Sequence, residues 1–361
     1  MKRLVLHIGH PKTGTTALQS VLSANANKLL EDAAVLYPTR TVPTEYKHAL
    51  AIPWLLQADN DSIRRRARLA GNELETLSKG YWESLVQETQ QRDASTVILS
   101  AEGFWSILRK VPDDQAKRFR NNLYAIADHV TVVAYIKSPA SYFLSRINQK
   151  LRNYRSVMLP RVDYISAAMQ NWENLGFDAY SWRIFDRKSL INEDIIDDFC
   201  GHHLPSSLDA STLTRSGVEQ ANSSVSNEAL VILEAITAQQ PILSEDLYDP
   251  RRSKIVSILR QADAAVGGNC RPSLTRAAHD GIVAHSKDLQ WLGERGLHFS
   301  DIDPSLINST AHSLPERFTS VADFCPIDPD RLESLRSLAM EPIDRLFQPQ
   351  MRRRLWSLLR K

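Results

Sequence analysis

Short apolar runs alternate with longer stretches of helical periodicity over the first half of the chain. Residues 4–8, 95–100 and 130–136 are rich in β-branched and aliphatic side chains, which is typical of strands covered on both faces. Residues 177–185 form a weaker candidate strand, and residues 15–30 place apolar side chains at helical spacing. The pattern predicts an α/β fold in which helices connect the strands of a parallel sheet.

After about residue 193 the strand pattern fades and helical periodicity dominates. It predicts helices over residues 226–238, 252–265 and 273–293 and from residue 331 to the end. We expect one domain over residues 1–361, with an α/β core in residues 1–200 and a mainly helical portion in residues 201–361 that completes the ligand cleft. The expected architecture has three layers, with helices flanking a parallel sheet.

The composition narrows the class of protein. The 361 residues are 43% hydrophobic and 24% charged, as in an ordinary globular enzyme, and the net charge of +2 argues against a nucleic-acid partner. Three cysteines, Cys200, Cys270 and Cys325, have the spacing of neither a disulfide framework nor a zinc site. Because no apolar run has the length of a signal peptide or a membrane span, we expect a protein of the reducing cytoplasm.

Residues 4–22, LVLHIGHPKTGTTALQSVL, have the glycine spacing of a nucleotide-binding P-loop at Gly9 and Gly14. In a Walker A loop the lysine follows the second glycine, whereas here Lys12 precedes it. A strand, a turn and a helix start in this order aim several backbone N–H groups at one point, which predicts an anion site. Hydroxyl donors come from Thr13, Thr15 and Thr16. The alternative is an ordinary helix start with capping threonines.

Residues 132–152, VVAYIKSPASYFLSRINQKLR, form the second informative stretch. A strand ending at Ile136 delivers Lys137 to the carboxyl edge of the sheet, where open α/β folds bind their ligands. Pro139 suits the first turn of a following helix, on which Ser145 lies further along. The alternative is a helix with a solvated basic face.

Together the two stretches resemble the sulfotransferase family that uses 3′-phosphoadenosine 5′-phosphosulfate (PAPS). The family's second motif is a strand-end arginine followed by a serine at the spacing of Lys137 and Ser145, with lysine here in place of arginine. The likeness covers roughly residues 4–230, and NSSVSNEAL is similar to a segment of the bacterial members. The family's loop, close to P-K-[ST]-G-[ST]-[ST], is similar at every position to Pro11, Lys12, Thr13, Gly14, Thr15 and Thr16.

The resemblance implies a P-loop-like fold and transfer of a sulfuryl group from PAPS to a hydroxyl, on a carbohydrate or another cell-envelope precursor. The second product is 3′-phosphoadenosine 5′-phosphate (PAP), and no metal is needed. The loop then holds the 5′-phosphate, and Lys12 meets the bridging oxygen as negative charge grows on the leaving phosphate. Lys137 and Ser145 hold the 3′-phosphate. This role accounts for the position of Lys12, which precedes the second glycine of the loop instead of following it.

Two residues are candidates for the general base that takes the acceptor's proton. Glu102 directly follows the strand predicted over residues 95–100, near where relatives carry a catalytic histidine. His48 follows the first helix, in a region where other relatives carry a catalytic glutamate, and we prefer it slightly because an imidazole works near neutral pH without a special environment. Either residue can instead be structural. His7 is expected to be a structural strand residue, and the aromatic run at residues 103–105 to belong to the core.

Other functions stay open. A P-loop kinase or ATPase is one alternative, although the Walker lysine is missing, and a non-catalytic nucleotide-binding protein is another. Basic clusters at residues 64–68 and 350–361 suit an anionic acceptor, a membrane surface or a partner, or are solvated helix faces. Contact with a membrane surface is not expected. The sequence leaves the identity of the acceptor and the oligomeric state open.

Overall fold

The chain divides into two compact units in the computed structural model, by the contacts between its residues. The first unit contains Met1–Ser138, Asp163–Asn222 and Asp288–Asp303, and the second contains Pro139–Val162, Ser223–Lys287 and Pro304–Lys361. Both are discontinuous in sequence, so their boundary differs from a division at residue 200. The structure describes residues 1–39, 47–56, 73–109, 111–153, 157, 164–215, 224–240, 249–268, 271–314 and 318–347.

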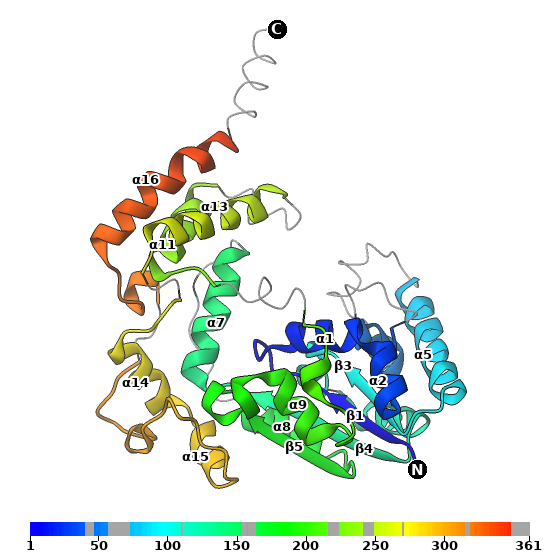
Figure 1. Cartoon of the computed structure of the whole chain (residues 1–361). Helices are drawn as coiled ribbons and strands as arrows, with labels where there is room; N and C mark the ends of the chain where they lie inside the picture. The colour runs from blue at the N-terminus through cyan, green and yellow to red at the C-terminus, as the bar shows by residue number, and fades with distance from the viewer. Residues whose placement is uncertain are drawn as a thin grey trace, which may run out of the picture. The chain divides into compact units, whose positions relative to one another are not determined.

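A five-stranded sheet forms the centre of the first unit, with all strands parallel and in the order β2-β3-β1-β4-β5 (Figure 1). Val5 of β1 pairs with Ile98 of β3 on one side and with Thr131 of β4 on the other. The predicted α/β fold with a parallel sheet is confirmed. Only β2 was not predicted, because its two residues are too few for a periodic signal. The strands are β1 (Arg3–His7), β2 (Val35–Leu36), β3 (Thr96–Ser100), β4 (His129–Ile136) and β5 (Ala179–Ile184).

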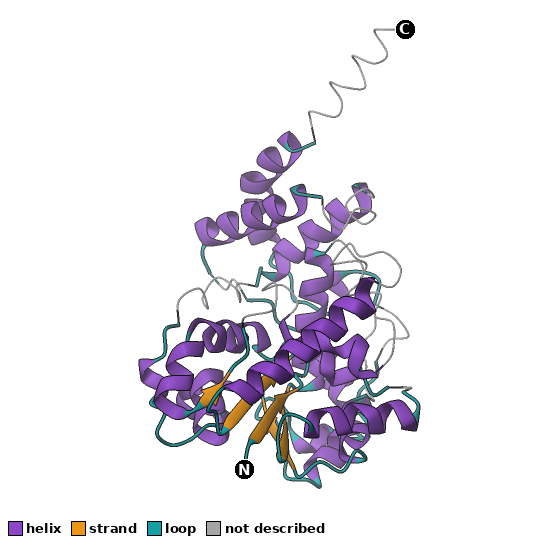
Figure 2. Ribbon diagram, turned by 90° about the vertical axis from the view of Figure 1, so that its right-hand side faces the viewer, coloured by secondary structure: helices purple, strands orange, loops and turns teal. Residues whose placement is uncertain are grey.

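Helices cover both faces of this sheet, as Figure 2 shows. Val5, Ile98 and Val133 lie in one buried cluster with residues of α1, α2 and α9. Leu4 and Leu6, which alternate with Val5 and so face the other way, are also fully buried. The helices of this unit are α1 (Thr15–Ala24), α2 (Ala26–Ala33), α3 (Ile52–Leu56), α5 (Glu73–Gln91), α6 (Asp113–Tyr124), α8 (Ile165–Glu173), α9 (Ile195–His203) and α15 (Asp288–Gly293), with short 3-10 turns η1 (Lys47–Ala51), η2 (Glu102–Ser106), η3 (Arg187–Ser189), η4 (Ile191–Glu193) and η5 (Ala210–Thr212).

The described part of the second unit is helical. α7 packs against α11 and α14, α13 packs against α16, and the rings of Phe143, Phe318 and Phe324 meet with centroids 5.1–5.6 Å apart. None of the described helices combines the length and the apolar character needed to cross a membrane. The elements are α7 (Pro139–Arg152), α11 (Asn227–Gln239), α13 (Arg251–Val266), α14 (Arg276–His285) and α16 (Pro329–Arg345), with η6 (Pro304–Leu306) and η7 (Val321–Asp323).

The helices predicted over residues 226–238 and 252–265 are confirmed as α11 and α13, but two other predicted helices are interrupted. The first breaks between α1 and α2 at Asn25, whose side-chain amide exchanges hydrogen bonds of 2.9 and 3.0 Å with the backbone of Thr214. The second breaks at Ser286, between α14 and α15, where the hydroxyl bonds the Ile282 carbonyl at 2.6 Å. In both cases a polar side chain offers the backbone a partner that competes with the helix. The predicted C-terminal helix is confirmed as α16, and its continuation past residue 347 lies outside the described residues.

The strand order creates a switch point beside the central strand β1. From β1 the chain crosses to β2, on the β3 side, whereas from β4 it continues to β5 on the opposite side. In open α/β sheets, ligands bind beyond the carboxyl ends of the strands where such connections diverge. The segments that follow β1 and β4 are therefore the place to look for chemistry.

Candidate functional site

The loop between β1 and α1 contains several residues with left-handed backbone. Gly9, Lys12 and Gly14 have φ of 77°, 72° and 74°, whereas Thr13 between the last two does not have a positive φ. When consecutive residues alternate between left-handed and right-handed backbone conformations, their N–H groups point to the same side and form an anion-binding nest. A lysine in this conformation costs roughly 1 to 3 kcal/mol, and such strain concentrates at functional sites. The loop predicted to bind an anion therefore has a backbone that suits anion binding.

The start of α1 keeps hydrogen-bonding capacity for a ligand. Gly14, at the N-cap, offers no capping side chain, and the first turn contains no acidic residue. Thr15 is 3% exposed, and its hydroxyl has no hydrogen-bond partner among the described residues. Thr13 instead donates to the His10 carbonyl at 2.6 Å, which ties the loop to itself. An anion at this helix start would meet free N–H groups and the positive end of the helix dipole.

Lys137 brings a second cation to the loop. It directly follows β4, the neighbour of β1, and its side chain is half-buried. Burial lowers the pKa of Lys137 to about 8, assisted by repulsion from Lys12 and opposed by Asp301. The charges of two lysines that are far apart in sequence thus act on each other where the segments after β1 and β4 meet. Two converging cations favour a ligand with more than one negative charge.

Glu102 lies against the first glycine of the loop. A Cβ added to Gly9 would stand 3.1 Å from the Glu102 Cα and 3.6 Å from its Cγ, so the two backbones approach closely. Glu102 begins η2 directly after β3, and its side chain is half-buried. The predicted base candidate therefore lies beside the loop, with a side chain that is partly open to solvent.

His48 has a different environment. Its side chain is 1% exposed, Nδ1 accepts the Ser100 backbone N–H at 2.7 Å, and Nε2 lies 3.0 Å from the Pro38 carbonyl. Because Nδ1 accepts a hydrogen bond, the ring is the neutral tautomer with its proton on Nε2. No ring nitrogen is left to take a proton from a substrate. The geometry favours a structural role for His48. It therefore favours Glu102 over His48 as the general base, whereas the sequence suggested a slight preference for His48.

The two histidines next to the loop are also buried. His7, in β1, bonds the Ser100 hydroxyl at 2.7 Å, and burial together with the neighbouring His203 lowers its pKa to about 3, so it is uncharged near neutral pH. His10 places Nε2 2.6 Å from the Tyr164 hydroxyl, and its ring meets the edge of Trp105 with centroids 4.9 Å apart. Trp105 and Phe104, the two aromatic residues of the run at residues 103–105, are buried as expected.

The remaining predicted residues are distributed as follows. Pro11 is half-buried and Thr16 is exposed, both in the loop. Ser145 lies on α7 in the second unit, whereas Lys137 belongs to the first unit. The basic clusters at residues 64–68 and 350–361, and Cys270, lie outside the described residues, whereas Cys200 and Cys325 are buried and free.

Sequence reasoning missed the returning segment (Asp288–Asp303), in which the chain comes back to the first unit. Asp288 accepts the backbone N–H groups of Tyr164 and Ile165 at 2.7 and 2.8 Å and so caps α8. Asp301 accepts the hydroxyl of Ser138, the neighbour of Lys137, at 2.6 Å. No local pattern marks these two aspartates, because each acts on a segment more than a hundred residues away.

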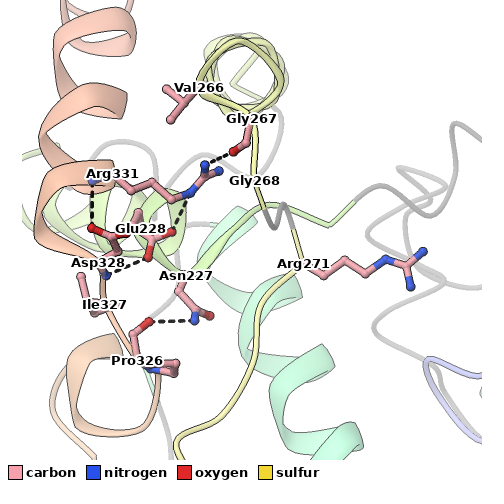
Figure 3. Close-up of a pocket in the computed structure, with 10 residues that line it drawn as sticks. All are labelled: Asn227, Glu228, Val266, Gly267, Gly268, Arg271, Pro326, Ile327, Asp328 and Arg331. Atoms are coloured by element: carbon pink, nitrogen blue, oxygen red, sulfur yellow. Dashed lines mark hydrogen bonds and ion pairs between the residues drawn. The ribbon is translucent and has the colours of Figure 1, made fainter.

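A hollow of about 580 Å³ lies in the second unit and is lined by ten residues (Figure 3). Arg331 at its centre pairs with Glu228 at 3.2 Å, and it also donates to the Gly267 carbonyl. Asn227 donates to the Pro326 carbonyl at 2.9 Å. The central polar groups are thus bonded to one another, which is typical of a structural clamp rather than of a ligand site.

No protein-family model, curated protein or solved structure matches this chain. The site is therefore judged from its own residues and geometry.

Proposed function

We propose that this protein is a P-loop-like sulfotransferase that moves a sulfuryl group from PAPS to a hydroxyl acceptor, a carbohydrate or another cell-envelope precursor. The observation that carries the proposal is the electrostatic proximity of Lys12 and Lys137 at the carboxyl ends of adjacent strands. PAPS and PAP carry two separate anionic groups, and each lysine would face one of them. The sulfotransferase-like motifs around both lysines support the same assignment.

The loop supports sulfuryl transfer better than phosphoryl transfer from ATP. In a Walker A loop the lysine opens the helix and reaches the outer phosphates. Lys12 instead sits in the nest before Gly14, with left-handed backbone. An ammonium group there approaches the anion from the side, where it would meet the bridging oxygen of the donor. A kinase or ATPase also offers no role for Lys137.

In the proposed reaction, the acceptor oxygen attacks the sulfur of PAPS. A new S–O bond forms to the acceptor while the bond from sulfur to the bridging oxygen breaks, and PAP leaves with that electron pair. Glu102 takes the acceptor's proton. The loop N–H groups and Lys12 stabilise the charge that grows on the 5′-phosphate. Lys137 holds the 3′-phosphate, with Ser145 as the second proposed ligand.

Calorimetric titration with PAP and with adenosine 5′-monophosphate tests the proposal. We expect PAP to bind more tightly by roughly 1.5 to 3 kcal/mol, the range of charge-assisted hydrogen bonds to the extra phosphate. Lys137→Ala should remove most of this difference and Lys137→Arg should preserve it. Equal affinity for the two nucleotides contradicts the proposal, and ATP binding that requires Mg²⁺ favours the kinase.

The same titration should depend on pH in a defined direction. The pKa of Lys137 is lowered to about 8, and a bound phosphate stabilises its charged form. PAP affinity should therefore be constant from pH 7 to about 8 and fall above that, by up to about tenfold per pH unit. Lys137→Arg should abolish this fall because arginine stays protonated.

Turnover is tested with radiolabelled PAPS and a panel of hydroxyl acceptors, in which a sulfated product is the expected result.

Glu102→Gln should lower the rate of sulfuryl transfer by about a hundredfold or more while leaving PAP affinity unchanged. The amide keeps the shape of the side chain at Gly9 but accepts no proton. Single-turnover kinetics give the rate, and calorimetry gives the affinity. Glu83→Gln, the same change at an exposed residue of α5, is the matched control. Full activity in Glu102→Gln would place the base elsewhere.

A further inference from the structure

The returning segment is attached to the carboxyl edge of the sheet at two adjacent strands. Ser300 donates a hydrogen bond to Asp186, which follows β5, and the next residue, Asp301, accepts the Ser138 hydroxyl at 2.6 Å after β4. Ser138 is buried, whereas Asp301 is exposed. A carboxylate is thereby held beside the β4 exit with one face open to solvent.

This carboxylate acts on Lys137. Among the described residues, the charged groups that act on Lys137 are Lys12, from the loop before α1, and Asp301, from the returning segment. The ring of Phe185, which follows β5, lies 5.6 Å from the ammonium and is uncharged. Lys12 opposes the charge of Lys137, whereas Asp301 supports it. Asp301, held at 2.6 Å from the hydroxyl of the neighbouring Ser138, thus attracts the ammonium of the lysine that is assigned to the 3′-phosphate.

We propose that Asp301 competes with the ligand's 3′-phosphate for Lys137 and thereby lowers the affinity of the protein for the PAP product. This inference rests on the proposed function, since it takes the 3′-phosphate as the anion that reaches Lys137. A carboxylate and a phosphate that share one ammonium repel each other, and the phosphate gains the full attraction of Lys137 only when Asp301 is neutralised or moves away.

The proposal predicts two effects of opposite sign in Asp301→Asn. Removing the negative charge removes the repulsion, so PAP should bind about three- to tenfold more tightly at pH 7 and low salt and dissociate more slowly. Removing it also removes the support for the charge of Lys137, so the fall in affinity at alkaline pH should begin at a lower pH than in the wild type. A purely structural role for Asp301 would produce neither the tighter binding nor the shift to lower pH of the fall in PAP affinity.

The experiment is titration of the full-length protein with PAP from pH 7 to 9.5, at low and high salt, with dissociation rates from stopped-flow displacement. Asp303→Asn, which removes the same charge from the same segment, is the matched control. Lys137→Ala shows whether PAP binding depends on Lys137. We expect tighter binding in Asp301→Asn alone, with the gain reduced at high salt. Unchanged or weaker binding, or an equal gain in Asp303→Asn, overturns the inference while the Lys137 dependence upholds the proposed function. PAP binding that Lys137→Ala leaves intact overturns both.

Discussion

Lys12→Met is expected to lower the rate of sulfuryl transfer by about 100- to 1000-fold, the range for loss of one preorganised group that stabilises developing charge. Lys12 has the left-handed backbone of the nest between Gly9 and Gly14, which would aim its ammonium at the bridging oxygen. Methionine keeps an unbranched side chain of similar length and removes the ammonium with its charge and its hydrogen-bond donors. The effect should appear in the single-turnover rate far more than in PAP affinity, because the charge on that oxygen grows as the bond breaks.

Lys12→Gly separates the backbone requirement from the charge. Glycine adopts φ of 72° without strain, so this variant should be at least as stable as the wild type and equally inactive. Lys28→Met, at an exposed lysine of α2 paired with Asp32 at 2.8 Å, is the matched control and should keep full activity. A loss of less than tenfold in both Lys12 variants would remove Lys12 from the chemistry.

Arg331→Met is expected to lower the free energy of unfolding by about 3 kcal/mol, as loss of one partner from a buried ion cluster does. Arg331 pairs with Glu228 at 3.2 Å (Figure 3) and with Asp263 at 2.7 Å. Glu228 and Asp263 are only 5% and 2% exposed. Without the guanidinium, two buried carboxylates lose their counter-charge. Ser226 still donates to Asp263, which keeps the loss at the lower end of the usual range.

Urea unfolding followed by circular dichroism measures the change. Arg336→Met is the matched control on the same helix, because Arg336 is 47% exposed and reaches Glu333 only at 4.0 Å. That variant should lose less than about 1 kcal/mol. If the two variants unfold at the same urea concentration, the cluster at Arg331 contributes nothing to stability.

The fold was predictable where the hydrophobic pattern is strong. Strands β1, β3 and β4 are covered on both faces, so each contains a run of consecutive apolar residues that stands out from the helices between them. The weak pattern of β5 matches its position at the edge of the sheet, where its residues are only half-buried. The breaks at Asn25 and Ser286 were not predictable, because hydrogen bonds that the periodicity does not record hold them.

The candidate site was predictable only in part. The anion loop is local in sequence, since a strand, a glycine turn and a helix start within a few residues define it. From the sequence, His48 and Glu102 were both candidates because each follows a predicted element, and His48 was preferred only slightly. Burial and the backbone partners of the two imidazole nitrogens distinguish them, and both depend on the packing of η1 against β3.

By itself, the sequence determined the parallel α/β sheet, the glycine-containing loop between its first strand and the following helix, and the delivery of Lys137 to the same edge. These follow from apolar periodicity and from the geometry of glycine turns, which act over short stretches of chain. Only the tertiary structure decided that Lys137 lies close enough to Lys12 to be repelled by it, that His48 is occupied by backbone and that Asp301 reaches Ser138. Charge and hydrogen bonding act through space between segments far apart in the chain, and the order of residues does not encode that proximity locally.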